Sequence, residues 1–197
     1  GAEIRGVDLT KPFDEPTRKA VFDLWLKHLV LLFRGQELTQ EQLVAATGNF
    51  GKLAKLARPA EFRPPGYARL LDNIMLISNI RENGVPIGAL PDGEMWFHHD
   101  MLHAELPHKG TCLYSIEVPS HGGNTLFANC YRAYETMPHD LRDTLEGKRA
   151  FNSYNLGELK RGDGKGVPHV KMSSHPAFRT HEETGRKAVS VNRLMTD

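Results

Sequence analysis

Cysteine is scarce in this chain: Cys112 and Cys130 are the only two among 197 residues. This scarcity excludes a disulfide-stapled scaffold and favours a reducing compartment. The chain also lacks an apolar run of roughly 20 residues, the length that a membrane-spanning helix needs. Its first residues do not show the basic and apolar blocks of a signal peptide. We therefore expect a cytoplasmic protein without a membrane partner, in which the cysteines fill strands and do no chemistry.

Neither sign of charge dominates, because 25 lysines and arginines almost balance 24 aspartates and glutamates, for a formal net charge of +1. This balance gives no electrostatic reason to expect a nucleic-acid partner. Hydrophobic residues make up 40% of the chain, enough to bury a core in one domain. We expect a single domain over residues 1–197 with a small molecule as its partner, and self-association into a homo-oligomer stays open.

The hydrophobic pattern predicts more strands than helices, with the helices placed early. Helices are expected from Pro16 and from Thr39, where Thr39-Gln40-Glu41-Gln42 has the form of a capping box, and a short one follows Pro138. Strands are expected at residues 1–9, 29–33, 73–78, 110–118, 125–128, 149–154 and 188–192. Strands and helices do not alternate regularly. We predict a mainly β protein with flanking helices (α+β), built as a double-stranded β-helix or jelly roll.

The glycine- and proline-rich segment 79–94 precedes the most informative stretch of the chain. Irregular loops of this length are typical of lids and binding loops, so we predict a mobile lid here.

Residues 95–101 read as a strand that contains His98, His99 and Asp100. Alternate side chains of a strand share a face, so His98 and Asp100 should converge while His99 points away. An imidazole and a carboxylate on rigid backbone can provide two of the three ligands of a facial iron(II) site. The same tripeptide could also be a hydrogen-bonded pair that only orients a histidine. We interpret His103 and His108 as solvated loop histidines.

Several ordered motifs across nearly the whole chain resemble the taurine dioxygenase family of iron(II)- and 2-oxoglutarate-dependent oxygenases. They are the opening residues 1–9, Phe33-Arg34-Gly35-Gln36, Phe50-Gly51-Lys52-Leu53, Trp96-Phe97-His98-His99-Asp100, residues 117–127 and residues 175–187. The resemblance implies that His98 and Asp100 bind the metal and that the hydroxyl of Thr125 helps to hold the distal carboxylate of 2-oxoglutarate. It implies a dioxygenase that uses Fe(II), 2-oxoglutarate and O2 to hydroxylate a small organic substrate. Succinate and CO2 are the co-products, and a C–S or C–O bond breaks when the hydroxylated carbon carries the heteroatom.

Two other functions compete with this interpretation. A zinc hydrolase could also use histidines and an aspartate, although the sequence has neither a His-Glu-x-x-His motif nor paired cysteines. A non-catalytic jelly-roll binding protein would keep the fold without the iron.

Three positions depart from the residues that contact taurine in the family. Leu56 and Pro59 stand where a histidine and a tyrosine are expected by ungapped count, and Glu94 replaces an asparagine. We therefore expect a substrate other than taurine.

The resemblance also places a second metal histidine and a 2-oxoglutarate-binding arginine beyond the position that matches Val191-Asn192. We expect the chain to be incomplete at its C-terminus, to lack the last strands of the jelly roll and to hold metal weakly. The alternative is that His169, His175 or His181 completes the metal site.

Overall fold

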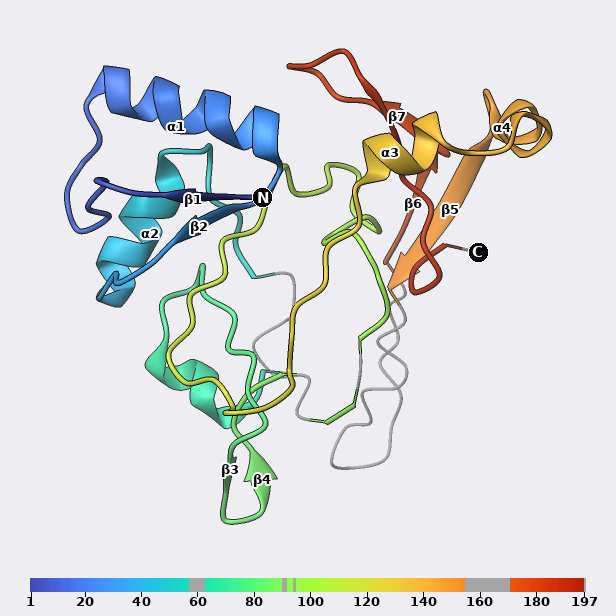
Figure 1. The fold of residues 1–197 in the computed structure, drawn as a ribbon. Helices are drawn as coiled ribbons and strands as arrows, with labels where there is room; N and C mark the ends of the chain where they lie inside the picture. The colour runs from blue at the N-terminus through green and yellow to red at the C-terminus, as the bar shows by residue number, and fades with distance from the viewer. Residues whose placement is uncertain (57–62, 90–91, 94, 155–170, 197) are drawn as a thin grey trace. The chain divides into compact units, whose positions relative to one another are not determined.

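The computed structural model describes residues 1–56, 63–89, 92–93, 95–154 and 171–196, which form two compact units, residues 1–94 and 95–197 (Figure 1). Each unit is treated by itself below. The expectation of a single catalytic domain over residues 1–197 stays a prediction.

The first unit begins with a small parallel sheet and the helix that connects its strands. Strand β1 (Ala2–Ile4) pairs with β2 (Leu31–Phe33), and α1 (Glu15–His28) links them (Figure 1). The carboxylate of Asp14 caps α1 by accepting the Thr17 backbone N–H at 2.8 Å. Val21 is the buried residue of the helix. The predicted strands and helix are confirmed here, although both strands are shorter than expected.

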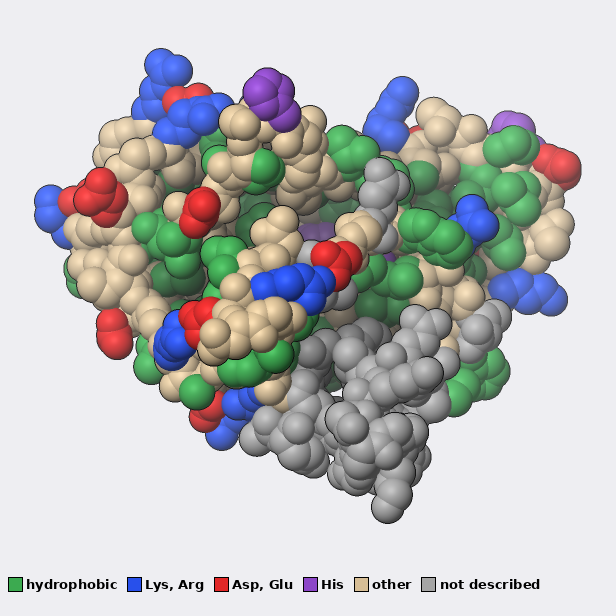
Figure 2. Space-filling view, turned by 90° about the horizontal axis from the view of Figure 1, so that it is seen from below, with side chains coloured by type: hydrophobic (Ala, Val, Ile, Leu, Met, Phe, Trp, Pro, Cys, Tyr) green, Lys and Arg blue, Asp and Glu red, His purple; other side chains and the backbone are tan. Residues whose placement is uncertain are grey.

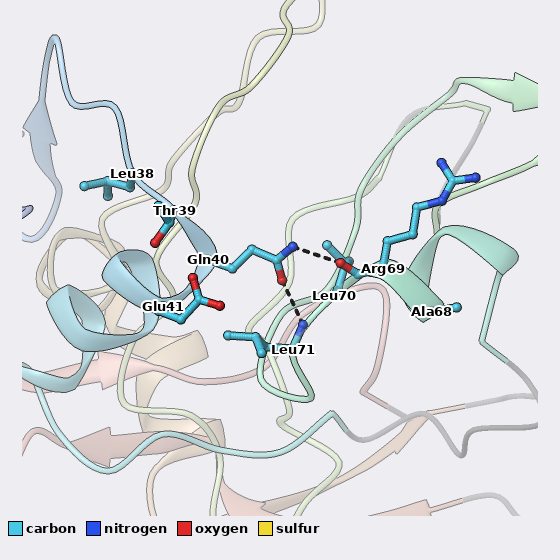
Figure 3. A pocket seen from close by; sticks show the side chains of 8 residues that line it. All are labelled: Leu38, Thr39, Gln40, Glu41, Ala68, Arg69, Leu70 and Leu71. Carbon is cyan, nitrogen blue, oxygen red and sulfur yellow. Dashed lines mark hydrogen bonds between the residues drawn. The ribbon is translucent and has the colours of Figure 1, made fainter.

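Helix α2 (Gln40–Gly48) begins at the predicted capping box, in which Thr39 and Gln42 each bond the other's backbone N–H. The side chain of Gln40 extends from the first turn to the end of the 3-10 helix η2 (Pro65–Arg69). It donates to the Arg69 carbonyl and accepts from the Leu71 N–H, both at 2.9 Å, across a shallow hollow (Figure 3). Gln40 thus ties the two helices together and forms part of the wall of this hollow.

The predicted lid contains a short hairpin, β3 (Arg81–Glu82) paired with β4 (Val85–Pro86). Its two-residue turn has left-handed backbone at Asn83 (φ 51°) and Gly84 (φ 78°), the conformation that such hairpins require. Residues 90–91 and 94 lie outside the described residues, and motion of this segment stays a prediction.

The second unit combines two short helices with two antiparallel strand pairs. Helices α3 (Cys130–Glu135) and α4 (His139–Leu145) precede β5 (Arg149–Tyr154), which pairs with β6 (Lys171–Pro176) (Figure 1). Strand β7 (Phe178–Thr180) pairs with β8 (Lys187–Val189), against which α3 packs. Its buried apolar side chains, among the described residues, are Leu102, Tyr131, Ala177, Phe178 and Met195. Helix α4 and strand β5 were predicted, whereas α3, β6 and β7 were not.

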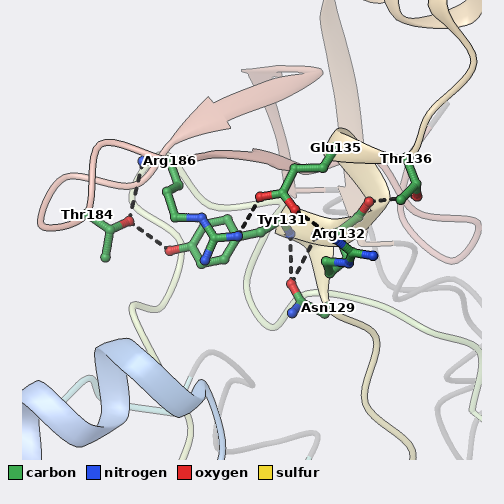
Figure 4. Close-up of polar contacts among 7 residues, drawn as sticks. All are labelled: Asn129, Tyr131, Arg132, Glu135, Thr136, Thr184 and Arg186. Carbon is green, nitrogen blue, oxygen red and sulfur yellow. Dashed lines mark hydrogen bonds and ion pairs between the residues drawn. The ribbon is translucent and has the colours of Figure 1, made fainter.

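Helix α3 is fixed to the turn between β7 and β8 by a stacked arginine (Figure 4). The Arg186 guanidinium carbon lies 4.1 Å from the centroid of the Tyr131 ring, and its Nη2 donates to Glu135 at 2.5 Å. Tyr131 is buried, and its hydroxyl hydrogen-bonds Thr184 Oγ1 at 3.0 Å. Arg186 is therefore an internal brace of this unit.

Several predicted strands are wrong. Residues 73–78, 95–101, 110–118 and 125–128 are not strands in the structure, although Ile77 makes one isolated bridge to Ala89. A strand exists only where a neighbouring backbone completes its hydrogen bonds. Residues 73–78 make two backbone hydrogen bonds with Ala89, too few for a strand, and the other three segments find no such partner among the described residues. Their apolar side chains remain exposed, including Ile116 at 84% and Phe127 at 66%.

The described strands form four two-stranded sheets, so the topology seen here is a mixture of small sheets and helices and does not display the predicted jelly roll. Apolar side chains lie among charged ones on the face seen in Figure 2. Among the described residues, no helix is both long and apolar enough to cross a membrane.

Candidate metal centre

His98 and Asp100 lie side by side in the second unit. His98 Nε2 is 3.3 Å from Asp100 Oδ1, and both side chains remain partly accessible, at 29% and 44%. The segment is not a strand, yet the i, i+2 spacing still places the two groups together. His99 points elsewhere, with its Nε2 3.6 Å from the Cys130 sulfur. The structure thus pairs the two predicted ligands and separates His99 from them; their role as metal ligands stays a prediction.

Hydrogen bonds orient both members of the pair. His98 Nδ1 lies 2.8 Å from the Trp96 carbonyl oxygen, which can only accept, so Nδ1 carries the proton. In the neutral ring, Nε2 then presents a lone pair toward Asp100. Asp100 Oδ2 accepts a 2.5 Å hydrogen bond from Thr111 Oγ1, which leaves Oδ1 facing the imidazole. Ligands of metal sites are commonly oriented by outer partners of this kind.

This geometry fits a metal ion. Two lone-pair atoms 3.3 Å apart repel each other unless a proton or a cation lies between them. An imidazole nitrogen and a carboxylate oxygen are donors that suit Fe(II) and Mn(II). The described residues contain no group of three His, Cys, Asp or Glu side chains placed to hold a metal ion. Two potential ligands are therefore assembled, and a third is not among them.

The other histidines considered for the third position have different neighbours. His175 Nε2 lies 2.8 Å from the Ala104 carbonyl oxygen, and His181 Nδ1 lies 3.2 Å from Glu183 Oε2. His169 is outside the described residues.

His99 occupies a half-buried position against the first residue of α3. Burial lowers the pKa of its imidazole, the positive charges of Arg179 and His98 act in the same direction, and Asp100 opposes them. Burial also raises the pKa of the Cys130 thiol. Both pKa shifts favour the neutral forms, as expected of a packing contact between Cys130 and the segment that carries His98 and Asp100.

A tight buried turn follows the pair. Met101 has left-handed backbone (φ 58°), and its carbonyl accepts the Ala104 N–H at 2.9 Å. Leu102 and His103, the two central residues of this turn, are buried. The interpretation of His103 as a solvated loop histidine is wrong, because the turn directs its ring inward, whereas His108 is exposed as predicted.

His175 connects this turn to β6. It is buried and donates from Nε2 to the Ala104 carbonyl. We expect His175→Ala to lower the free energy of unfolding by about 1–3 kcal/mol, because it leaves the partly buried Ala104 carbonyl without this partner. Urea unfolding measures the free energy of unfolding of this variant and of His108→Ala, a control substitution at an exposed histidine.

His175→Gln offers an N–H donor of similar reach and should restore much of the lost stability. Equal losses for His175→Ala and His108→Ala would show that the hydrogen bond contributes nothing.

Thr125 lies in an exposed stretch, and no hydrogen bond to its side chain is present among the described residues. Its contact with 2-oxoglutarate stays a prediction. Leu56 is described in the first unit, whereas Pro59 and Glu94 are outside the described residues.

Sequence reasoning missed the groups that support the pair. Thr111, Cys130 and His175 are 11, 31 and 71 residues from the atoms they contact. It also missed Arg193, whose guanidinium carbon lies 4.1 Å from the centroid of the Trp96 ring. No local periodicity encodes contacts between residues so far apart in the chain.

Known proteins are similar to this chain over nearly its whole length. A family model described as "Taurine catabolism dioxygenase TauD, TfdA family" matches residues 1–197. The chain is 29% identical to the (S)-phenoxypropionate/alpha-ketoglutarate-dioxygenase of Sphingobium herbicidovorans, over 98% of this chain and 67% of that protein. It is 31% identical to the alpha-ketoglutarate-dependent 2,4-dichlorophenoxyacetate dioxygenase of Cupriavidus pinatubonensis, over 96% of this chain and 69% of that protein.

A solved structure is similar as well. The crystal structure of a taurine dioxygenase from Burkholderia xenovorans superposes with a TM-score of 0.69 at 26% identity, covering 99% of this chain and 60% of that one. The chain thus spans about two thirds of these curated relatives and 60% of the solved structure.

Proposed function

Because the chain belongs to the taurine catabolism dioxygenase TauD/TfdA family, we propose that the protein is an Fe(II)- and 2-oxoglutarate-dependent dioxygenase that hydroxylates a small organic substrate. The observation that carries this proposal is the convergence of His98 Nε2 and Asp100 Oδ1, with Nδ1 fixed on a backbone carbonyl. The proposal includes the complete jelly roll, a cytoplasmic location and a role for Thr125 in holding 2-oxoglutarate. The curated relatives named above act on aryloxy acids, which makes such acids the first substrates to test.

The residues of this chain would bind the metal ion and hold its ligand atoms in the required orientation. His98 would present Nε2 to the metal because the Trp96 carbonyl holds the proton on Nδ1. Asp100 would provide the negative charge that matches a divalent cation, with Thr111 fixing its second oxygen. Bound iron(II), with 2-oxoglutarate and oxygen, supplies the oxidising chemistry that yields hydroxylated substrate, succinate and CO2. Where the hydroxylated carbon carries an ether oxygen, the product collapses and the C–O bond breaks.

Succinate formation tests the proposal. The intact protein is incubated with Fe(II), ascorbate, 2-oxoglutarate and either 2,4-dichlorophenoxyacetate or phenoxypropionate, and then with a wider set of sulfonates, sulfate esters and amino acids. We expect substrate-stimulated succinate release with Fe(II) and none with Zn(II). A zinc hydrolase or a binding protein would release no succinate under any of these conditions.

A further inference from the structure

The chain that follows Asp100 returns to it through Thr111. The Thr111 hydroxyl donates to Asp100 Oδ2, 11 residues earlier in the chain, so the intervening residues form a closed loop. This loop is fastened near its start at Ala104, whose carbonyl accepts from His175 Nε2 at 2.8 Å. The last stretch before Thr111 is exposed and belongs to no helix or strand. A contact from elsewhere in the unit therefore has to hold this hydroxyl in place.

Glu183 supplies such a contact. Its Oε1 forms an ion pair with the ammonium group of Lys109, two residues before Thr111. The side chains of Glu183 and Lys109 are 23% and 40% exposed, so solvent ions screen this pair less than a fully exposed one. The other carboxylate oxygen, Oε2, lies 3.2 Å from His181 Nδ1. Glu183 therefore contacts the loop with one oxygen and its own turn with the other.

The turn that carries Glu183 is itself fixed. Residues 181–186 connect β7 to β8, and two backbone hydrogen bonds close this turn, at 2.9 and 2.8 Å. Thr184 and Arg186 attach the turn to the Tyr131 ring on α3 (Figure 4). Groups on a rigid support hold a site more precisely than groups on a loose loop. The turn is thus a fixed base for the Glu183 carboxylate.

We propose that Glu183 is a positioning residue for the metal centre, which acts by holding Lys109 and through it the Thr111 hydroxyl. The hydroxyl in turn fixes Asp100 Oδ2 and leaves Oδ1 directed at His98. The ion pair limits where the backbone two residues further along can lie, so the hydroxyl stays within reach of the carboxylate. This inference rests on the proposed function and deepens it by naming a distant residue that sets the geometry of a ligand.

Two physical effects would link Glu183 to metal affinity, and they differ in sign. If the charges acted on the metal ion through space, loss of the Glu183 carboxylate would weaken binding of a divalent cation, whereas loss of the Lys109 ammonium would strengthen it. If the pair acts by position, either loss releases the same hydroxyl, and both losses weaken binding. The sign of the Lys109 effect therefore separates positioning from a through-space effect.

Mn(II) binding to the intact protein, followed by electron paramagnetic resonance, tests the positioning role without turnover. We expect Glu183→Gln and Lys109→Gln each to weaken Mn(II) binding about three- to tenfold, less than the roughly 10–100-fold typical when a direct partner of a ligand is lost. Lys109→Arg keeps the ion pair and should bind Mn(II) like the unsubstituted protein. In a Thr111→Val background, Glu183→Gln should cause no further loss, because the hydroxyl through which it acts is already absent.

Another lysine–glutamate pair of the same unit gives the matched control. Lys187 Nζ lies 2.5 Å from Glu146 Oε1, and these side chains are 38% and 48% exposed. Glu146→Gln removes the same kind of interaction and should leave Mn(II) binding unchanged. Urea unfolding of Glu183→Gln and of Glu146→Gln should show similarly small losses of stability, since each variant loses one partly exposed ion pair. A difference in Mn(II) affinity between them then reports on position and not on general destabilisation.

The positioning role is refuted if Lys109→Gln binds Mn(II) more tightly than the unsubstituted protein, or if Glu183→Gln binds it equally well. It is also refuted if the Glu183→Gln loss persists undiminished in the Thr111→Val background. Succinate release by the unsubstituted protein in any of these cases leaves the proposed function intact. If the expected losses of Mn(II) affinity occur in a protein that releases no succinate, only the proposed function is overturned.

Discussion

The Asp100→Ala protein is expected to release no succinate above background. Asp100 provides the carboxylate that faces His98 Nε2, so its loss leaves a single imidazole at the proposed metal position. Loss of an outer partner alone typically lowers metal affinity roughly 10–100-fold, and loss of a ligand should exceed that. Mn(II) binding, followed by electron paramagnetic resonance, measures the affinity directly and does not depend on turnover.

Asp140→Ala is the matched control, because Asp140 is an exposed carboxylate on α4. It should bind Mn(II) like the unsubstituted protein. Thr111→Val should cause a smaller loss, since it removes only the hydrogen bond to Oδ2. Full activity in Asp100→Ala would show that the ligand assignment is wrong.

The Leu102→Ala protein should have the largest loss of stability among single substitutions near the site. Leu102 is 1% exposed and lies inside the turn that follows Asp100. Removal of a buried leucine costs about 2–5 kcal/mol through lost burial and the cavity that remains. The midpoint and slope of urea unfolding give the difference in free energy. Mn(II) affinity should fall as well, because the turn positions Asp100.

Leu106→Ala gives the comparison within the same loop, since Leu106 is 86% exposed. It should change the free energy of unfolding by no more than about 0.5 kcal/mol. A similar small effect for Leu102→Ala would mean that the turn is not packed as described.

Local sequence signals predicted the elements that local interactions determine. Helix α2 follows from Thr39 and Gln42, which satisfy the first N–H groups without help from any other segment. Residues 110–118 have the composition of a strand, but composition does not supply the neighbouring backbone that a strand needs. Helix α3 escaped prediction because it has six residues, too few to show a helical period, and Asn129 is its one clear start signal.

The same contrast between local and long-range interactions applies at the candidate site. The two-residue spacing was enough to bring His98 and Asp100 together, even though the predicted strand is wrong. Thr111, which bonds Asp100, and His175, which bonds the following turn at Ala104, come from distant parts of the chain. Their contacts depend on tertiary packing, which periodicity and capping patterns do not report.

The hydrogen bond between His175 and Ala104 has a consequence for the order of folding. It joins residues 71 positions apart, whereas β7 and β8 are joined by a turn of a few residues. Closing a long loop costs more chain entropy than closing a short one, so local hairpins form before such distant contacts. The turn that follows Asp100 should therefore form late, after the hairpin of β7 and β8 has formed. A newly made chain would thus form this hairpin before the contact between His175 and Ala104 fixes the turn that follows Asp100.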